Sequence, residues 1–224
     1  MTTPKEIARR FLASDVANEL RLKVVTGGIP PGSRINEKML CDEFGISRTP
    51  LREALKILHS EGLIDLPPNR GAHVPKLYAP RVLEQIEAIS GIERHATEIA
   101  ARKITPQELR RLRKLQDQIE AAFESKNAKK YLSSNDEIHR AIVQASGNAI
   151  LADLHERLFV QVQRARTLGV SSPIRWAESV AEHVGILEAL EERNAALAGE
   201  LMRQHNMNSG KAIVACILEL EKTQ

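Results

Sequence analysis

"SRTPLREALKILHSEGLI", residues 47–64, has the pattern of an amphipathic helix with cations and hydroxyls in its first turns. Its leucines recur at helical spacing and predict a buried stripe. Arg48 and Arg52 lie near the start of this helix. There the positive end of the helix dipole disfavours cations by a few tenths of a kcal/mol, up to ~1. We therefore expect an anion outside the helix beside these arginines.

The segments on either side predict a winged helix-turn-helix domain. Upstream, a helical pattern over about residues 4–26 ends at the connector "GGIPPGSRI", which is rich in Gly and Pro. A short helix follows, with Asn36 as its N-cap and Gly45 as its stop. Downstream, residues 63–66 and 72–74 flank a Pro-Pro-Asn-Arg-Gly turn and predict a β-hairpin.

The second half of the chain predicts an all-α bundle. Thr105 and Pro106 begin one of its helices as N-cap and first helical residue. The predicted fold is mainly α, with a winged helix-turn-helix domain over 1–76, a linker over 77–80 and a six- or seven-helix bundle over 81–224. The expected helices of the bundle lie at about 81–103, 106–125, 128–146, 148–168, 174–193 and 195–222.

The composition is that of an ordinary globular protein. Of 224 residues, 42% are hydrophobic but only 3% are aromatic, so the core is expected to be aliphatic. Cys41 and Cys216 belong to no CxxC or Cys/His cluster, which argues against a disulfide framework and fits a reducing cytosol. We find no apolar signal-peptide core and no run near the ~18 apolar residues of a membrane span. We expect a soluble, cytoplasmic protein without a membrane partner.

Position, not bulk charge, indicates DNA binding. Residues 1–75 contain 11 Lys and Arg against nine Asp and Glu. In a helix-turn-helix, however, the N-terminal part of the second helix faces bases and flanking phosphates. Arg48 and Arg52 share one helix face, and each arginine–guanine pair discriminates by ~1–3 kcal/mol. Arg70, at the hairpin tip, could reach the adjacent minor groove. The alternative is that these arginines only solvate a helix.

Residues 10–76 resemble the N-terminal domain of GntR-family bacterial transcription regulators. "PPGSRINE", "GISRTPLREAL" and "RGAHV" stand in the family's order and spacing. The resemblance implies a homodimer on a palindromic double-stranded DNA operator. It matches the family's DNA-contacting positions to Lys38, Ser47, Arg48, Thr49, Arg52 and Gly71.

Three histidines of the predicted bundle suggest a metal site. His139, His183 and His205 lie on different predicted helices, and Asn135 precedes His139 by one turn. Imidazoles from three helices plus one oxygen suit Zn²⁺, Ni²⁺ or a similar divalent ion. Asp136 is a competing oxygen donor, about 100° away from Asn135 around the helix. Spacing alone leaves surface or hydrogen-bonded histidines as the alternative.

Residues 80–222 resemble the FCD ligand-binding domain of the FadR-like GntR subgroup. The similarity runs through "IERHATEIAARKITPQELRRL", "NDEIHRAIVQASGNAIL" and "EHVGILEALEERNAALAGELMRQH". It implies a divalent metal beside a small-molecule effector, with Asn135, His139, His183 and His205 as ligands. Two departures stand out: Asn135 is neutral where many members have Asp, and Ile89 replaces an arginine that serves acidic effectors.

The lost arginine leaves the effector class open. Arg157 and Arg164, seven residues apart on one predicted helix, could hold an effector such as an organic acid, or could be surface residues. We expect a ligand-responsive transcription regulator, most simply a repressor, and not an enzyme. The alternatives are a helical metalloenzyme using the three histidines and an architectural DNA-binding protein with a purely structural bundle.

Overall fold

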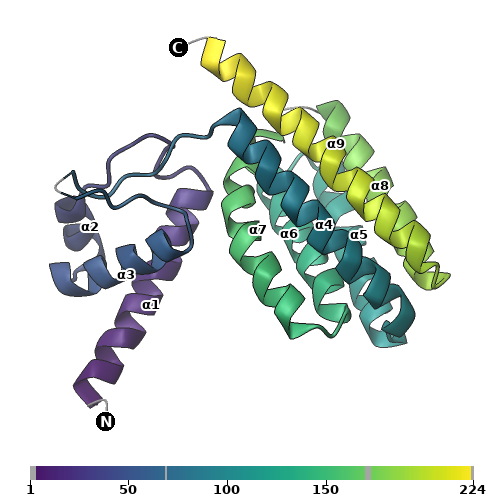
Figure 1. Cartoon of the computed structure of the whole chain (residues 1–224), viewed down its shortest axis with the longest axis horizontal. Helices are drawn as coiled ribbons and strands as arrows, with labels where there is room; N and C mark the ends of the chain where they lie inside the picture. The colour runs from purple at the N-terminus through teal and green to yellow at the C-terminus, as the bar shows by residue number, and fades with distance from the viewer. Residues whose placement is uncertain (1–3, 69, 170–172, 223–224) are drawn as a thin grey trace. The chain divides into compact units, whose positions relative to one another are not determined.

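The chain is described from a computed structural model that covers residues 4–68, 70–169 and 173–222 (Figure 1). Within these ranges the chain is mainly helical, and its only β-structure consists of isolated bridges. It divides into two compact units, residues 1–77 and residues 78–224. None of the helices in the described ranges is long and apolar enough to span a membrane.

The N-terminal unit contains α1 (Pro4–Val25), α2 (Glu37–Phe44) and α3 (Arg48–Ser60). Both α1 and α2 pack against α3, whose leucine stripe is buried as predicted. Asn36 accepts a hydrogen bond from the Met39 backbone N–H, and Gly45 ends α2 with a φ of 62°. Ser47 occupies the N-cap position of α3, but its side chain makes no capping hydrogen bond.

The wing, residues 63–74, is less regular than the β-hairpin predicted from the sequence. Residues 63–66 and 72–74 meet at one bridge, in which Asp65 and His73 exchange backbone hydrogen bonds of 2.9 and 3.1 Å. His73 forms a second bridge with Arg34. The prediction of two strands was wrong in their length, since only isolated bridges form among the described residues. Prolines follow residue 66 directly, and because proline has no N–H to donate, the ladder cannot continue.

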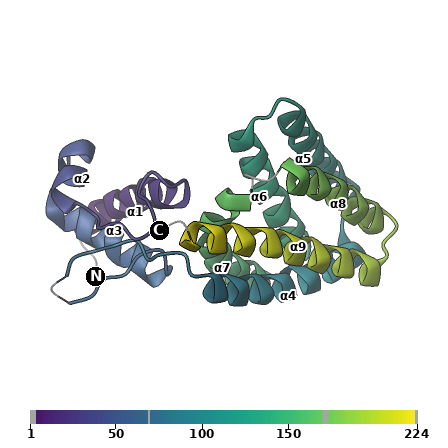
Figure 2. The same ribbon diagram turned by 90° about the horizontal axis from the view of Figure 1, so that it is seen from above.

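The second unit is a helical bundle, and α4 lies alongside α9 in both ribbon views (Figures 1 and 2). α4 also packs on α6 and α7, while α5 packs on α6 and α8. Every helix end lies within two residues of its predicted position. The six helices described in this unit are α4 (Ala79–Lys103), α5 (Pro106–Glu124), α6 (Ala128–Ala145), α7 (Ala149–Gly169), α8 (Pro173–Glu191) and α9 (Ala195–Lys222).

Local sequence signals fix several of these ends. Thr105 and Glu108 form a capping box, in which each side chain bonds the other residue's backbone N–H. Residues 79 and 80, which were expected in the linker, form the first turn of α4, where proline is tolerated. Gly210 lets α9 approach α4 closely, since a Cβ there would lie 2.7 Å from Ile86 Cγ2.

Candidate DNA-binding surface and effector site

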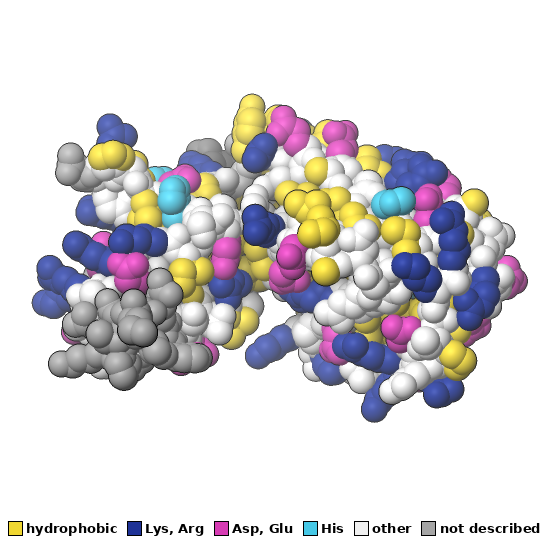
Figure 3. All heavy atoms as spheres, turned by 60° about the horizontal axis from the view of Figure 1, so that its bottom comes forward, with side chains coloured by type: hydrophobic (Ala, Val, Ile, Leu, Met, Phe, Trp, Pro, Cys, Tyr) yellow, Lys and Arg dark blue, Asp and Glu magenta, His cyan; other side chains and the backbone are white. Residues whose placement is uncertain are grey.

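An open groove lies between the wing and the start of α2 in the N-terminal unit. Its walls include three basic residues, Arg34, Lys38 and Arg48, together with Gly71 and the acidic Glu37, which pairs with Arg52. Lys38 is exposed on α2, and Arg48 is exposed at the start of α3. Figure 3 shows basic and acidic side chains interspersed over the surface that it presents. Because bulk charge is so mixed, the local pairing of each cation decides where an anion can bind.

The groove cations differ from their neighbours in being unpaired. Other cations of this unit form ion pairs, namely Arg21–Glu61, Lys23–Glu43 and Lys56–Glu53. Within the described residues, no carboxylate or hydrogen-bond acceptor engages the side chains of Arg34, Lys38 or Arg48. A cluster of unneutralised cations attracts a polyanion, and phosphate contacts supply most of the affinity of such complexes.

The remaining positions predicted to contact DNA surround this groove without lining it. Ser47 and Thr49 are exposed at the start of α3, and Arg70 is exposed on the wing. Arg52 is also exposed, but its Nε donates to Glu37 Oε2 at 3.2 Å. Sequence reasoning did not single out Arg34, although it lies within the quoted "PPGSRINE".

In the helical unit, His139, His183 and His205 converge from α6, α8 and α9. All three are at most 2% exposed. His205 Nε2 lies 3.2 Å from His139 Nε2 and 3.3 Å from His183 Nε2. One potential ligand atom from each histidine lies within 4.8 Å of the others. The packing of three helices thus brings together residues that are 44 and 22 positions apart in the chain.

Two carboxylates, the buried Glu93 and the partly buried Glu182, determine which imidazole nitrogens carry protons. His139 Nδ1 lies 2.6 Å from Glu93 Oε2, and His205 Nδ1 lies 2.8 Å from Glu182 Oε2. An ionised carboxylate can only accept, so both Nδ1 atoms must be the donors. In a neutral imidazole the other nitrogen then carries a lone pair. The Nε2 atoms of His139 and His205 therefore face each other, 3.2 Å apart, without a proton between them.

The electrostatics favour neutral imidazoles and ionised carboxylates. Burial lowers the pKa of His205 to about 4 and that of His183 well below its usual range. Burial also lowers the pKa of His139, against the opposing effect of Glu93. Burial alone would raise the pKa of Glu93, but interactions with its histidine partners outweigh this and lower the pKa well below its usual range. At neutral pH His139 and His205 therefore present lone pairs to the centre of the cluster.

This donor set fits a divalent cation. Two nitrogens bound tetrahedrally at ~2.0–2.1 Å lie ~3.3–3.4 Å apart, close to the Nε2–Nε2 separations of 3.2 and 3.3 Å in this cluster. A cation would also relieve the repulsion between the facing lone pairs. Carboxylates that hold the distal nitrogens of metal-bound histidines are a common feature of such sites. His183 Nδ1 has no hydrogen-bond partner among the described residues.

The two candidate oxygen ligands face different surroundings. Asn135 is buried on α6, one turn before His139, and lines a cavity together with His205. Asp136 instead accepts a hydrogen bond from Gln163 Nε2 and lies 3.6 Å from Arg166 Nη1. These contacts engage Asp136 with α7, on another face of its helix. The geometry therefore favours Asn135 over Asp136 as an oxygen donor beside the histidines.

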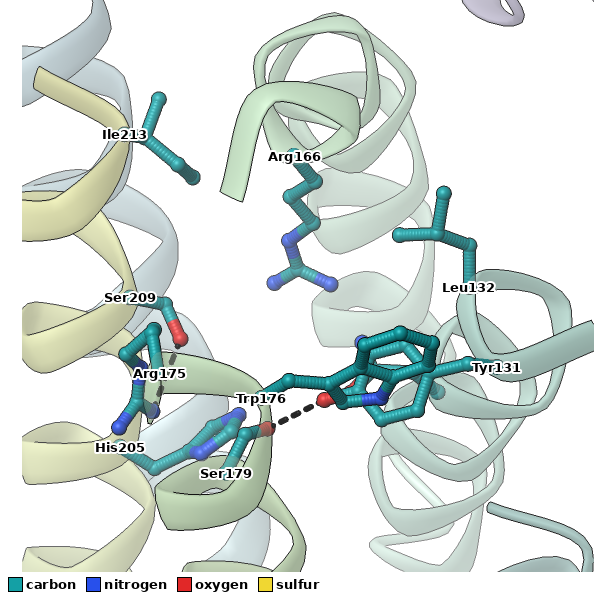
Figure 4. A pocket seen from close by; sticks show the side chains of 10 residues that line it. Tyr131, Leu132, Arg166, Arg175, Trp176, Ser179, His205, Ser209 and Ile213 are labelled. Atoms are coloured by element: carbon teal, nitrogen blue, oxygen red, sulfur yellow. Dashed lines mark hydrogen bonds between the residues drawn. The ribbon is translucent and has the colours of Figure 1, made fainter. Parts of the chain in front are cut away.

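The cavity beside the histidines has a volume of about 50 Å³ and is shown in Figure 4. Arg166 points its guanidinium into this space from α7, while Arg175 and His205 lie on the opposite side. Tyr131 donates to Ser179 Oγ at 2.8 Å, and Arg175 donates to Ser209 Oγ at 3.2 Å. The volume holds only a few water molecules, so a larger ligand requires side chains to move.

The arginines of the cavity are not those proposed from the sequence. Arg157 is exposed on α7, and Arg164 is buried but does not line the cavity. They were proposed together because residues seven apart share a helix face. Arg166, two positions beyond Arg164, lies on a different face, and it is this face that packs toward α6 and α9. Arg166 and Arg175 therefore replace Arg157 and Arg164 as the cavity cations.

Arg166 is nearly buried but incompletely bonded. Its Nη2 donates to Asn206 Oδ1 at 3.4 Å and lies 4.0 Å from Glu93 Oε1. Its Nη1 forms an ion pair with Asp136 Oδ1 at 3.6 Å but has no closer hydrogen-bond partner among the described residues. Ile89, where the family resemblance implied an arginine, lines a small void together with Arg166. The cation that α4 lacks at position 89 is thus present nearby on α7.

Sequence reasoning missed the buried polar network around the histidines. Glu93 accepts from His139, from His155 at 2.8 Å and from Asn206 at 2.7 Å, and its side chain is fully buried. A signal did exist for Glu93, because it falls on the helical stripe that continues from buried Ile86 and Ile89. A charged residue on such a stripe needs buried partners.

Comparisons with known proteins agree with both halves of this description. Residues 12–74 match the model of bacterial regulatory proteins of the gntR family, and residues 84–208 match the FCD domain. The HTH-type transcriptional regulator McbR of Escherichia coli K12 is 31% identical over 67% of this chain and 68% of its own length. Its solved structure has a TM-score of 0.81 at 24% identity, covering 94% of this chain and 98% of that one.

Two further relatives match most of the chain. YdhC of Bacillus subtilis 168, an HTH-type transcriptional regulator, is 28% identical over 84% of each chain. The HTH-type transcriptional repressor RspR of E. coli K12 is 28% identical over 83% of this chain and 82% of its own length. The matched domains and relatives are transcription regulators, not enzymes.

Proposed function

Because this chain belongs to the GntR family of bacterial transcription regulators and contains an FCD ligand-binding domain, we propose that it is an effector-responsive repressor. It binds a palindromic operator as a homodimer in the bacterial cytoplasm. Its helical unit holds a divalent metal ion and a small anionic effector. The repressor assignment is supported by the relative RspR, which is named as a repressor.

The observation that carries the DNA-binding part is the set of unpaired cations beside α3. Lys38 and Arg48 lie on one groove without acidic partners among the described residues. Arg52 follows Arg48 by one helical turn on the same face. In this arrangement Arg48 and Arg52 read base edges, while Ser47 and Thr49 hydrogen-bond phosphates. Arg70 and Gly71 place the wing beside the adjacent minor groove.

The test is recovery of specific DNA from sheared genomic fragments. The purified protein is expected to enrich a few palindromic sites, and Arg48→Ala/Arg52→Ala is expected to lose this enrichment. A Lys56→Ala protein is the control, because Lys56 is an α3 cation paired with Glu53 outside the groove. Uniform recovery of all fragments by the wild-type protein would contradict specific operator binding.

His139, His183, His205 and Asn135 would hold the metal ion. The support for this is the pair of facing lone pairs at 3.2 Å, which a divalent cation would stabilise. When bound, the ion supplies a Lewis-acidic point to which a carboxylate oxygen of an effector can bind. The protein's own residues orient the imidazoles through Glu93 and Glu182 and exclude bulk water by burial.

Metal analysis of variants tests this site. His183→Ala is expected to lose copurifying or added Zn²⁺, because it removes one of three converging imidazoles. His95→Ala is the matched control, since His95 is exposed on α4 and lies outside the cluster. Full metal stoichiometry in folded His183→Ala protein would disprove the assignment.

Arg166 supports an anionic effector. Its guanidinium enters the cavity, and the nearest acceptor to its Nη1 among the described residues is Asp136 Oδ1 at 3.6 Å, beyond hydrogen-bond distance. A carboxylate between Arg166 and the histidine cluster would satisfy this group. To act as an inducer, the effector must bind the DNA-free arrangement of the dimer more tightly than the DNA-bound one.

A further inference from the structure

Arg34 lies in the groove, but it is not among the positions that the family resemblance matches to DNA contacts. It is also not one of the proposed base contacts. It lies on the extended segment between α1 and α2, outside the recognition helix α3. Its backbone bridges to His73 of the wing. The neighbouring residues hold this segment in place, since Ile35 N–H donates to Ala72 O at 2.8 Å and Val74 N–H donates to Ser33 O at 2.9 Å.

The Arg34 side chain lies against the glycine at the wing tip. A Cβ on Gly71 would meet both Arg34 Nε and Arg34 Nη2 at 3.2 Å. Gly71 also has a φ of 74°, which L side chains rarely adopt. A side chain at position 71 would therefore be strained and would push the guanidinium away. Gly71 has no side chain with which to contact DNA, but it makes room for one that can.

The charge of Arg34 is available to a ligand. The residue is exposed, and no acidic partner neutralises it within the described residues. It shares its groove with Lys38 and Arg48, so a strand that contacts those two cations passes close to it. Because Arg34 sits beside the wing and not on α3, the DNA backbone flanking the major groove is the part it can reach.

We propose that Arg34 is a DNA phosphate contact, held in position by Gly71 of the wing. The inference rests on the proposed function, because it takes DNA as the ligand of this unit. It adds a cation outside the wing to the one that Arg70 supplies from within it. It also predicts that substitutions at Gly71 act largely through Arg34.

The experiment measures binding of the full-length protein to two short duplexes, one carrying an enriched genomic site and one of scrambled sequence, over a range of salt concentrations. Each phosphate contact contributes about 0.9 to the slope of log affinity against log salt. Arg34→Ala is expected to weaken binding to both duplexes and to reduce the slope by about 0.9 per bound protomer. Between 50 and 200 mM salt, this changes the ratio of wild-type to variant affinity by about 3.5-fold per protomer.

Two further variants test whether the loss is specific to Arg34 and whether Gly71 acts through it. Lys56→Ala removes an exposed cation from the same unit and is expected to leave the slope unchanged. Gly71→Ala is expected to weaken binding in the wild-type background but to add little in the Arg34→Ala background. Additive losses would show that Gly71 acts independently of Arg34 and would overturn their coupling. Circular dichroism would confirm that each variant is folded.

The possible failures are distinguishable. An unchanged salt slope in Arg34→Ala, together with lost operator binding in Arg48→Ala, would overturn this inference and leave the proposed function intact. Weaker binding of Arg34→Ala to the operator alone would indicate a base contact and would also overturn the phosphate assignment. Wild-type protein that binds neither duplex would overturn both the inference and the proposed function.

Discussion

Replacing Glu93 with Gln should weaken metal binding although all three histidines of the cluster remain. In the helical unit, Glu93 accepts hydrogen bonds from His139, His155 and Asn206 at 2.6–2.8 Å. An amide of the same shape keeps one acceptor and replaces the other with an NH₂ group. One of the two imidazoles would then face a donor, and in either orientation of the amide the negative charge that favours the Nδ1–H form of His139 is lost.

The expected size of the effect follows from this geometry. Loss of a hydrogen-bond partner behind a metal-binding histidine lowers metal affinity by ~10- to 100-fold. Zn²⁺ at 100 times its Kd stabilises a folded protein by ~2.7 kcal/mol. At the same Zn²⁺ concentration, the weakened site would provide only ~0.4 to ~1.4 kcal/mol. The loss should therefore be visible both in affinity and in unfolding.

Titration calorimetry with zinc chloride measures the affinity, and thermal unfolding with and without Zn²⁺ measures the stabilisation. Glu87→Gln is the matched control, because Glu87 is an exposed carboxylate on the same helix. Wild-type zinc affinity in folded Glu93→Gln protein would refute the role of Glu93 in orienting His139. Equal losses in the Glu87→Gln control would point to a general charge effect.

Three other perturbations have defined outcomes. Gly210→Ala should destabilise the helical unit by ~1–2 kcal/mol in denaturant unfolding, because overpacking outweighs the gain in helix propensity. Gly185→Ala is the control and should not destabilise the unit, since its new Cβ would have no neighbour closer than 3.7 Å. Thr105→Ala should cost ~1 kcal/mol at neutral pH. Hydrogen bonds from the Thr105 backbone and side chain lower the pKa of Glu108. The capping box therefore stabilises the fold at pH values above the ordinary pKa of Glu, and its contribution shrinks on acidification. A loss of stability in Thr105→Ala that does not change with pH would contradict this. Arg166→Leu should abolish thermal stabilisation by small organic acids, and a response equal to that of the wild type would exclude Arg166 as their anchor.

The helices were predictable because their ends depend on local chemistry. Asn36 caps α2 through a neighbouring backbone N–H, and Gly45 ends the helix through its own conformation. Thr105 does the same for α5 through the capping box. None of these signals depends on which helices meet in the folded unit. The sequence therefore predicted each helix end to within two residues.

The cavity could be predicted only in part, because its composition depends on which helix faces meet. The sequence identified the three histidines, which the structure brings together. It indicated Arg157 and Arg164 instead of Arg166, since spacing along α7 does not reveal which face packs inward. The strands of the wing were predicted to be longer than they are for a related reason. The backbone of residues 72–74 is hydrogen-bonded partly to Asp65 and partly to residues 33–35, so no regular two-stranded ladder forms in the part of the wing that the structure describes.

The contact between Glu37 and Arg52 bears on how the proposed recognition helix meets DNA. The bond is made through Nε, so the two terminal nitrogens of the guanidinium are left for another acceptor pair. Much of the rotational freedom of a long arginine side chain is lost when it docks, up to ~2 kcal/mol. Glu37 restricts that freedom before DNA arrives, so less of it remains to be lost when Arg52 binds a base. Preorganisation of this kind raises affinity for a base with two matching acceptors without adding any new contact.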